Sequence, residues 1–205
     1  MKRFPTLLLL VGAAILSVHA QTPSGNPVPA TTYRSMTGAE RWTHYWKGTM
    51  LSPRIYGASL GGGFISHLEN DPPEWRQGMA GYGRRVASSL GVRIVQETVH
   101  QAGSAAMGYD PLYRRCECQG VWRRSVHAVK WSFVTRNKEG QTRFDLPAMG
   151  SAYAGSMISM EWYPHRYTPW GDGVRYGHYQ AGLVVGLNVL REFMPDVKRI
   201  LKIKN

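Results

Sequence analysis

Apolar residues in this chain recur every three or four positions, and this spacing restricts its fold more than any other feature. The longest series steps along one segment toward His100 (Met79, Tyr82, Val86, Leu90 and Ile94). A period near 3.6 residues places such side chains on one face of a helix, whereas a half-buried strand alternates every two residues. Proline-containing breaks such as Ser52-Pro53 separate the segments. The pattern predicts a mainly α-helical, compact bundle.

Local signals predict where several helices begin and end. Thr37 and Glu40 have capping-box spacing, and Asp71 and Glu74 repeat it beside two prolines. A final helix is expected from Val174 to Met194, before Pro195. Residues 121–144 fit two interpretations, because apolar residues there match both a helical and an alternating pattern. We favour a helix over 121–136, and a short β-hairpin near 129–144 is the alternative.

Small residues recur at every fourth position in four of the expected helices. The sets are Gly57 and Gly61; Gly83, Ala87 and Gly91; Ser151, Gly155 and Ser159; and Gly182 and Gly186. Such small-xxx-small stripes let a neighbouring helix approach closely, which can offset the cost of glycine inside a helix, up to ~1 kcal/mol relative to alanine. A chain with 23 glycines also produces such spacings by chance. We expect these stripes to be helix-packing surfaces.

The N-terminal segment predicts export. Lys2 and Arg3 precede an apolar run, which ends with Ala20 at a small-residue cleavage site. The run is shorter than the ~20 apolar residues of a membrane-spanning helix, although an uncleaved anchor is an alternative. We therefore expect a signal peptide over 1–20, a flexible linker rich in proline, threonine and serine over 21–36, and one helical domain over 37–205. The expected location is the periplasm or the periphery of the outer membrane.

The charge of the chain indicates its partners. The net charge is +12, and it becomes +10 when Lys2 and Arg3 are removed with the signal peptide. An exported protein rarely meets nucleic acid, so we expect none as a partner, and an anionic envelope surface, an acidic protein or peripheral membrane contact fits better. Three arginine pairs are candidate anion-binding residues (Arg84, Arg85, Arg114, Arg115, Arg123 and Arg124). A solvated basic surface without a specific partner is the alternative.

Few motifs indicate chemistry. Cys116 and Cys118 should not persist as free thiols in an oxidising compartment, so a tight local disulfide and an intermolecular bridge both remain open. Glu97 and His100 have Glu-x-x-His spacing on an expected helix and are candidate metal ligands, although a surface carboxylate near an ordinary histidine fits the pattern more simply. Ser59 lies in a G-x-S-x-G sequence, but no strand precedes it as a hydrolase nucleophile requires. We expect no cofactor, with a bound metal ion as the alternative.

Three separate stretches of the chain carry a resemblance. They are Tyr82 to Arg84 with Asp110 to Arg114, then Arg124 with His127 and Ala128, and then Asn188 with Glu192, Phe193, Pro195 and Asp196. Over residues 38–200 the chain resembles a group of uncharacterised exported bacterial proteins, and the resemblance implies an exported, mostly helical envelope protein. We expect a non-enzymatic envelope protein. The alternatives are a metal-binding or hydrolytic enzyme on a helical bundle and a secreted basic binder of anionic lipid or glycan.

Overall fold

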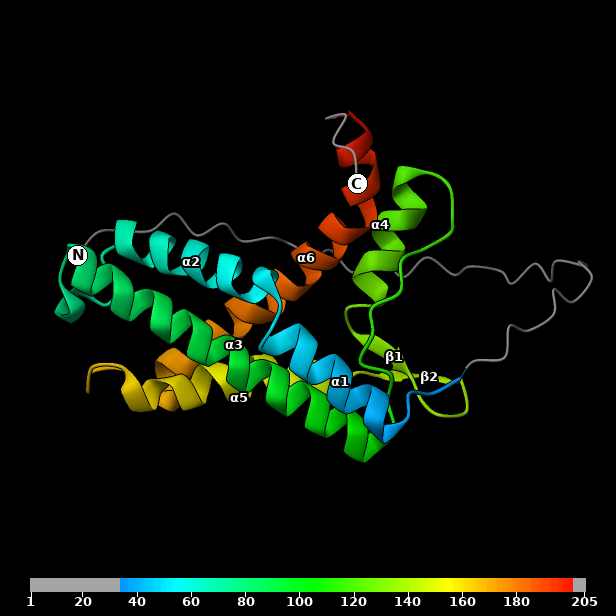
Figure 1. Ribbon diagram of the computed structural model, residues 1–205, viewed down its shortest axis with the longest axis horizontal. Helices are drawn as coiled ribbons and strands as arrows, with labels where there is room; N and C mark the ends of the chain where they lie inside the picture. Colours follow the sequence, from blue (N-terminus) through cyan, green and yellow to red (C-terminus); the bar gives the residue numbers. More distant parts are fainter. Residues whose placement is uncertain (1–33, 201–205) are drawn as a thin grey trace, which may run out of the picture. The chain divides into compact units, whose positions relative to one another are not determined.

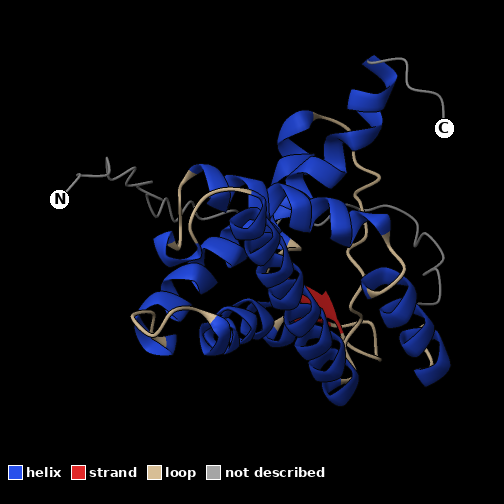
Figure 2. Cartoon of the chain, turned by 60° about the vertical axis from the view of Figure 1, so that its left-hand side comes forward, coloured by secondary structure: helices blue, strands red, loops and turns tan. Residues whose placement is uncertain are grey.

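The computed structural model describes residues 34–200. The predicted signal peptide and most of the predicted linker therefore lie outside the described residues. The described part is mainly α-helical, as predicted, with one two-stranded antiparallel sheet (Figures 1 and 2). Its elements are α1 (Gly38–Thr49), α2 (Pro53–Leu68), η1 (Pro73–Trp75), α3 (Met79–Met107), α4 (Val121–Lys130), β1 (Val134–Arg136), β2 (Thr142–Phe144), α5 (Leu146–Ser159), η2 (Met160–Trp162), η3 (Pro169–Gly173) and α6 (Val174–Ile200).

The long helix α3 is the centre of the packing. It contacts α1, α2 and α5, and in Figure 1 α2 lies above it and α5 below it. Helix α5 packs in turn against α6, and α6 packs against α4. Helix α4 therefore joins the bundle mainly through α6.

Side-chain caps explain several helix boundaries. The predicted capping box at α1 is confirmed, because the Thr37 hydroxyl accepts from the Glu40 backbone N–H while the Glu40 carboxylate accepts from the Thr37 N–H. The second predicted capping box is wrong as the start of the long helix. Asp71 precedes only the short η1, which contains Glu74, and α3 begins at Met79.

The ambiguous segment 121–144 contains both structures that its pattern allows. Helix α4 ends at Lys130, so the prediction of a helix to Arg136 is wrong in its last turns. Residues 134–144 form the alternative hairpin, in which Thr135 lies opposite Arg143. The Thr135 hydroxyl donates to the backbone oxygen of Asp110 at 2.7 Å, which ties the hairpin to the loop before α4. The last helix also differs from its predicted end at Met194, because α6 continues to Ile200.

Close helix packing through small residues occurs, but mostly in another register than predicted. The stripe of Ser151, Gly155 and Ser159 is buried, and a Cβ added at Gly155 would lie 2.3 Å from the side chain of Gln96 on α3. A Cβ on any glycine of the stripes Gly57/Gly61 and Gly182/Gly186, or on Gly83, would meet nothing within 4 Å among the described residues. In α2 and α6 the close approaches occur instead at Gly63 and Gly177.

The interior of the bundle is unusually polar. Among residues 34–200, fifteen polar or charged residues are buried, including Arg85, Asn188 and Glu192, against five hydrophobic ones. Large apolar side chains are exposed on several helices, including Leu60 and Phe64 of α2. Within the same residues, no helix is both long enough and apolar enough to cross a bilayer.

Candidate functional site

Helix α6 is joined by polar contacts to α4 and to Ser132, which lies just after α4. Helix α6 presents three polar residues at a spacing of four. The Asn188 amide donates to the Ser132 hydroxyl at 2.9 Å, His127 donates to the Glu192 carboxylate at 2.9 Å, and Arg124 forms an ion pair with Asp196 at 2.5 Å. Residue numbers fall along α4 as they rise along α6, so the two helices run antiparallel. We call this set of three contacts the polar ladder.

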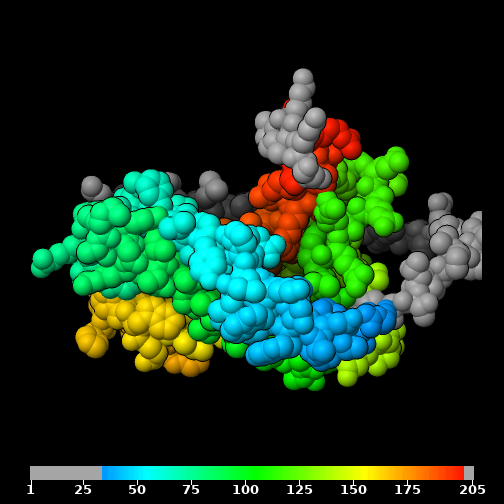
Figure 3. All heavy atoms as spheres, in the orientation of Figure 1, coloured from blue at the N-terminus to red at the C-terminus, as the bar shows by residue number. Residues whose placement is uncertain are grey.

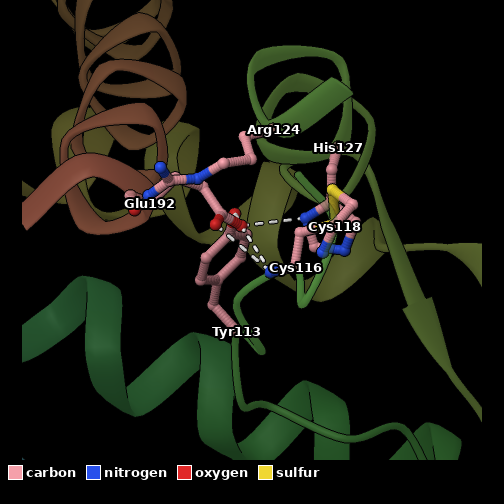
Figure 4. The surroundings of a disulfide bond; sticks show 6 residues. All are labelled: Tyr113, Cys116, Cys118, Arg124, His127 and Glu192. Carbon is pink, nitrogen blue, oxygen red and sulfur yellow. Dashed lines mark hydrogen bonds and ion pairs between the residues drawn. A yellow bond between two sulfur atoms is a disulfide. The ribbon is translucent and has the colours of Figure 1, made fainter. Parts of the chain in front are cut away.

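Glu192 is the centre of the ladder (Figure 4). Its side chain is 1% exposed and accepts three hydrogen bonds, from the Tyr113 hydroxyl at 2.5 Å, the Cys116 backbone N–H at 2.9 Å and the His127 Nδ1–H at 2.9 Å. These donors come from the loop after α3 and from α4. One carboxylate on α6 therefore holds both segments in place.

Hydrogen bonds and ion pairs in this cluster shift the pKa values of its members. Burial alone would raise the pKa of Glu192, but the hydrogen bonds from Tyr113, Cys116 and His127 outweigh it and hold the pKa below its usual value. Burial raises the pKa of Tyr113, and its bond to the Glu192 carboxylate raises it further. Arg124 lowers the pKa of Asp196. Glu192 is thus an ionised buried carboxylate at neutral pH.

The ladder determines which face of α4 points outward. Arg124 and His127 point toward α6, so the opposite, apolar face of α4 lies in solvent. Its side chains are exposed by 72% at Val121, 79% at Trp122, 47% at Val126 and 44% at Val129. We call these four residues the α4 apolar stripe. Figure 3 shows α4, in green, at the surface beside α6. The usual orientation of an amphipathic helix, with its apolar face toward the core, is reversed here.

The structure joins Cys116 and Cys118 in a local disulfide, with their Cα atoms 5.1 Å apart. Both residues are partly exposed and lie in the loop between α3 and α4. The backbone N–H of Cys118 donates to Cys116 Sγ at 3.1 Å. The disulfide therefore adjoins the Glu192 cluster through the backbone of Cys116.

The predicted metal ligands Glu97 and His100 lie one turn apart on α3. Glu97 accepts a hydrogen bond from the Gln101 side-chain amide at 2.8 Å, and that amide also contacts His44 at 3.3 Å. His100 Nε2 is buried without a hydrogen-bond partner. Among the described residues, no three histidine, cysteine or acidic side chains are grouped to hold a metal ion. Metal binding by Glu97 and His100 thus stays a prediction with two candidate ligands.

The six predicted anion-binding arginines do not form one surface. Arg85 is buried, and its guanidinium donates to backbone oxygens of the segment before α3, including Pro72 at 2.7 Å. Arg124 is engaged with Asp196, and Arg114 pairs with Asp110 at 3.1 Å. The remaining three, Arg84, Arg115 and Arg123, are exposed. Arg85 and Arg124 are therefore engaged in contacts within the bundle, and anion binding by these arginines stays a prediction.

Two further features have structural roles. The Asp71 carboxylate accepts hydrogen bonds from the hydroxyls of Tyr167, at 2.5 Å, and Tyr176, so the segment before α3 is tied to the loop before η3 and to α6. Ser59 donates to the backbone oxygen of Ile55 at 2.7 Å inside α2. It therefore has the environment of a helix residue rather than that of a strained nucleophile turn.

Sequence reasoning missed Glu192 as a site residue, although its signal was present. Asn188, Glu192 and Asp196 are each four residues apart, which places them on one helix face. They belong to the stretches that carry the resemblance, and so do Tyr113, Arg124 and His127 among their partners. No known protein family, curated protein or solved structure matches this chain.

Proposed function

We propose that this chain is an exported cell-envelope protein that attaches peripherally to an anionic membrane surface through the α4 apolar stripe. The observation that carries the proposal is the outward orientation of that stripe. A helix with one apolar face and basic polar residues binds in the plane of a membrane interface. The predicted signal peptide supports the envelope as the location of this membrane.

The charges beside the stripe favour an anionic surface over a second copy of the chain. Every charged residue of α4 is basic, and Arg123 and Lys130 are exposed next to the apolar side chains. Two such faces would repel each other, whereas anionic lipid attracts them by ~1 kcal/mol for each basic residue near the surface. The net charge of the chain acts in the same direction.

The apolar exterior elsewhere supports the same conclusion. Helix α2 exposes Leu60, Phe64 and Leu68 while it buries Ser59. Single exposed apolar residues are ordinary, but contiguous apolar surface indicates an interaction site. The polar interior and apolar helix faces fit a protein that works beside hydrocarbon better than one surrounded by water.

Vesicle sedimentation tests the attachment. The exported, purified chain should bind phosphatidylglycerol vesicles more tightly than phosphatidylcholine vesicles, and added salt should weaken the binding. An aromatic side chain buries ~150–250 Å², so inserting the exposed part of Trp122 halfway contributes ~2 kcal/mol at ~25 cal/mol per Å². Trp122→Ser should therefore weaken binding by about thirtyfold, and adding Val126→Ser should weaken it further.

Trp170→Ser is the matched control, because Trp170 is 81% exposed and lies on η3. It should bind as tightly as the unchanged chain. Equal losses in the control and the double variant, or equal binding to both lipids, would contradict attachment through α4. Circular dichroism establishes that the variants are folded, and N-terminal sequencing of the exported chain tests cleavage after Ala20.

A further inference from the structure

The disulfide between Cys116 and Cys118 stabilises the fold less than a bridge that closes a long loop. It closes a loop of three residues, and the entropy that a disulfide removes from the unfolded chain grows with loop length. It also connects no two elements of secondary structure. The Glu192 carboxylate, rather than the sulfur bridge, holds this part of the loop, because it accepts from the Cys116 backbone N–H. That hydrogen bond involves neither sulfur atom.

The surroundings of the bridge are those of a reactive sulfur pair. Both cysteines are partly exposed, so a thiol can reach them. The Cys118 N–H that donates to Cys116 Sγ stabilises negative charge on that sulfur. Arg115 is an exposed cation next to Cys116 in the chain, although Glu117 between the two cysteines offsets part of its effect. Cys116 is therefore the better leaving sulfur of the two.

A proton carrier lies beside the pair. His127 Nδ1 and the Cys116 backbone nitrogen both lie 2.9 Å from the same oxygen of Glu192, so they are at most about 5.8 Å apart. Among the described residues, His127 Nε2 makes no hydrogen bond, and the side chain is 21% exposed. Glu192 holds Nδ1 in its protonated form, which leaves Nε2 to accept a proton.

From these observations we propose that Cys116–Cys118 is a redox-active disulfide that exchanges with the thiols of other exported proteins, with His127 as the proton carrier. A substrate thiol gives its proton to His127, and its thiolate attacks Cys118 Sγ. The bond between the two cysteines breaks, and its electron pair leaves on Cys116 Sγ as a thiolate. The product at this stage is a mixed disulfide between the substrate and Cys118.

The second half of the exchange resolves the mixed disulfide. A second substrate thiol gives its proton to the Cys116 thiolate and attacks the substrate sulfur. Cys118 then leaves and takes up the proton held by His127. The substrate dithiol has lost two electrons and two protons, which the cysteine pair has gained. The reverse reaction with a disulfide-bearing protein oxidises the pair again, so dithiol and disulfide proteins are the only co-reactants.

Reaction with glutathione tests this activity without any membrane, so its outcome is separate from that of vesicle binding. The opening of the bridge is monitored by trapping free thiols with an alkylating agent and measuring the masses of the products by mass spectrometry. The reference is a synthetic oxidised peptide of residues 112–120, which carries the same cysteines and arginines without the fold. The full chain should react at least about tenfold faster than this peptide at neutral pH. Equal rates would overturn the proposal.

A histidine variant tests the proton carrier. His127→Gln should slow the reaction severalfold and change the dependence of its rate on pH. His165→Gln, at an exposed histidine of the loop after η2, should leave both unchanged. A His127→Gln chain that is folded and has an unaltered rate and pH profile would refute the role of His127.

Discussion

Replacing Glu192 by glutamine removes a buried charge on which three donors converge, so it should destabilise the fold strongly. Glutamine keeps one acceptor oxygen but turns an NH2 group toward donors that then lack a partner. A hydrogen bond to a charged group contributes ~1.5–3 kcal/mol, and two of the three are lost or weakened. The expected decrease in the free energy of unfolding is ~3–5 kcal/mol, which is a large part of the ~5–15 kcal/mol typical of a folded protein.

The pH dependence of this effect has a definite sign. The pKa of Glu192 is lowered in the folded protein. Its contribution is therefore fully present above the unfolded pKa near ~4.3, and it is lost as the pH falls through the folded pKa. The stability difference between the unchanged chain and Glu192→Gln should be largest at neutral pH and should shrink below about pH 4.

Urea unfolding followed by circular dichroism measures the difference, provided that the dependence on denaturant is the same in both chains. Glu139→Gln is the matched control, because Glu139 is exposed in the hairpin turn, and it should change stability by less than ~0.5 kcal/mol. A loss below ~1 kcal/mol for Glu192→Gln at pH 7, or an equal loss at pH 3, would refute the reasoning.

Two further predictions concern packing and the tyrosine cluster. Gly155→Val should destabilise the protein by ~1–3 kcal/mol, because an added Cβ lies 2.3 Å from a side chain of α3. Gly150→Ala on the same helix meets nothing within 4 Å and should stabilise the protein by up to ~1 kcal/mol. Thermal unfolding of the two variants measures the difference. Burial raises the pKa of Tyr167 and Tyr176, and the Asp71 carboxylate raises it further. Asp71→Asn should therefore lower the pKa of both phenols. An alkaline titration monitored by ultraviolet absorbance would contradict this if the variant showed no earlier ionisation.

The helical class of the fold could be predicted from the spacing of apolar residues, and the start of α1 from its capping box. The register of the packing could not. A four-residue spacing of small residues shows that a smooth face exists, but not whether a neighbour covers it. Gly57 and Gly61 face solvent, whereas Gly63, two positions further along α2, contacts α3.

The site was harder to predict because the apolar face of α4 points outward, which is the reverse of the usual orientation. The helical spacing of Trp122, Val126 and Val129 would ordinarily place these side chains toward the core, since apolar faces usually point inward. The structure buries the opposite face, because His127 and Arg124 find acidic partners on α6. Only the contacts with α6, which are distant in sequence, decide the orientation of α4.

The polar ladder also fixes the register of α4 along α6. An apolar seam between two helices tolerates a shift of one turn, because one aliphatic contact substitutes for another. A shift of one turn here would place His127 opposite Asn188 or Asp196 and would leave the Glu192 carboxylate without its imidazole partner. The α4–α6 alignment is thus set by the chemical identity of each pair rather than by shape, and α4 has one register in which every buried charge is matched.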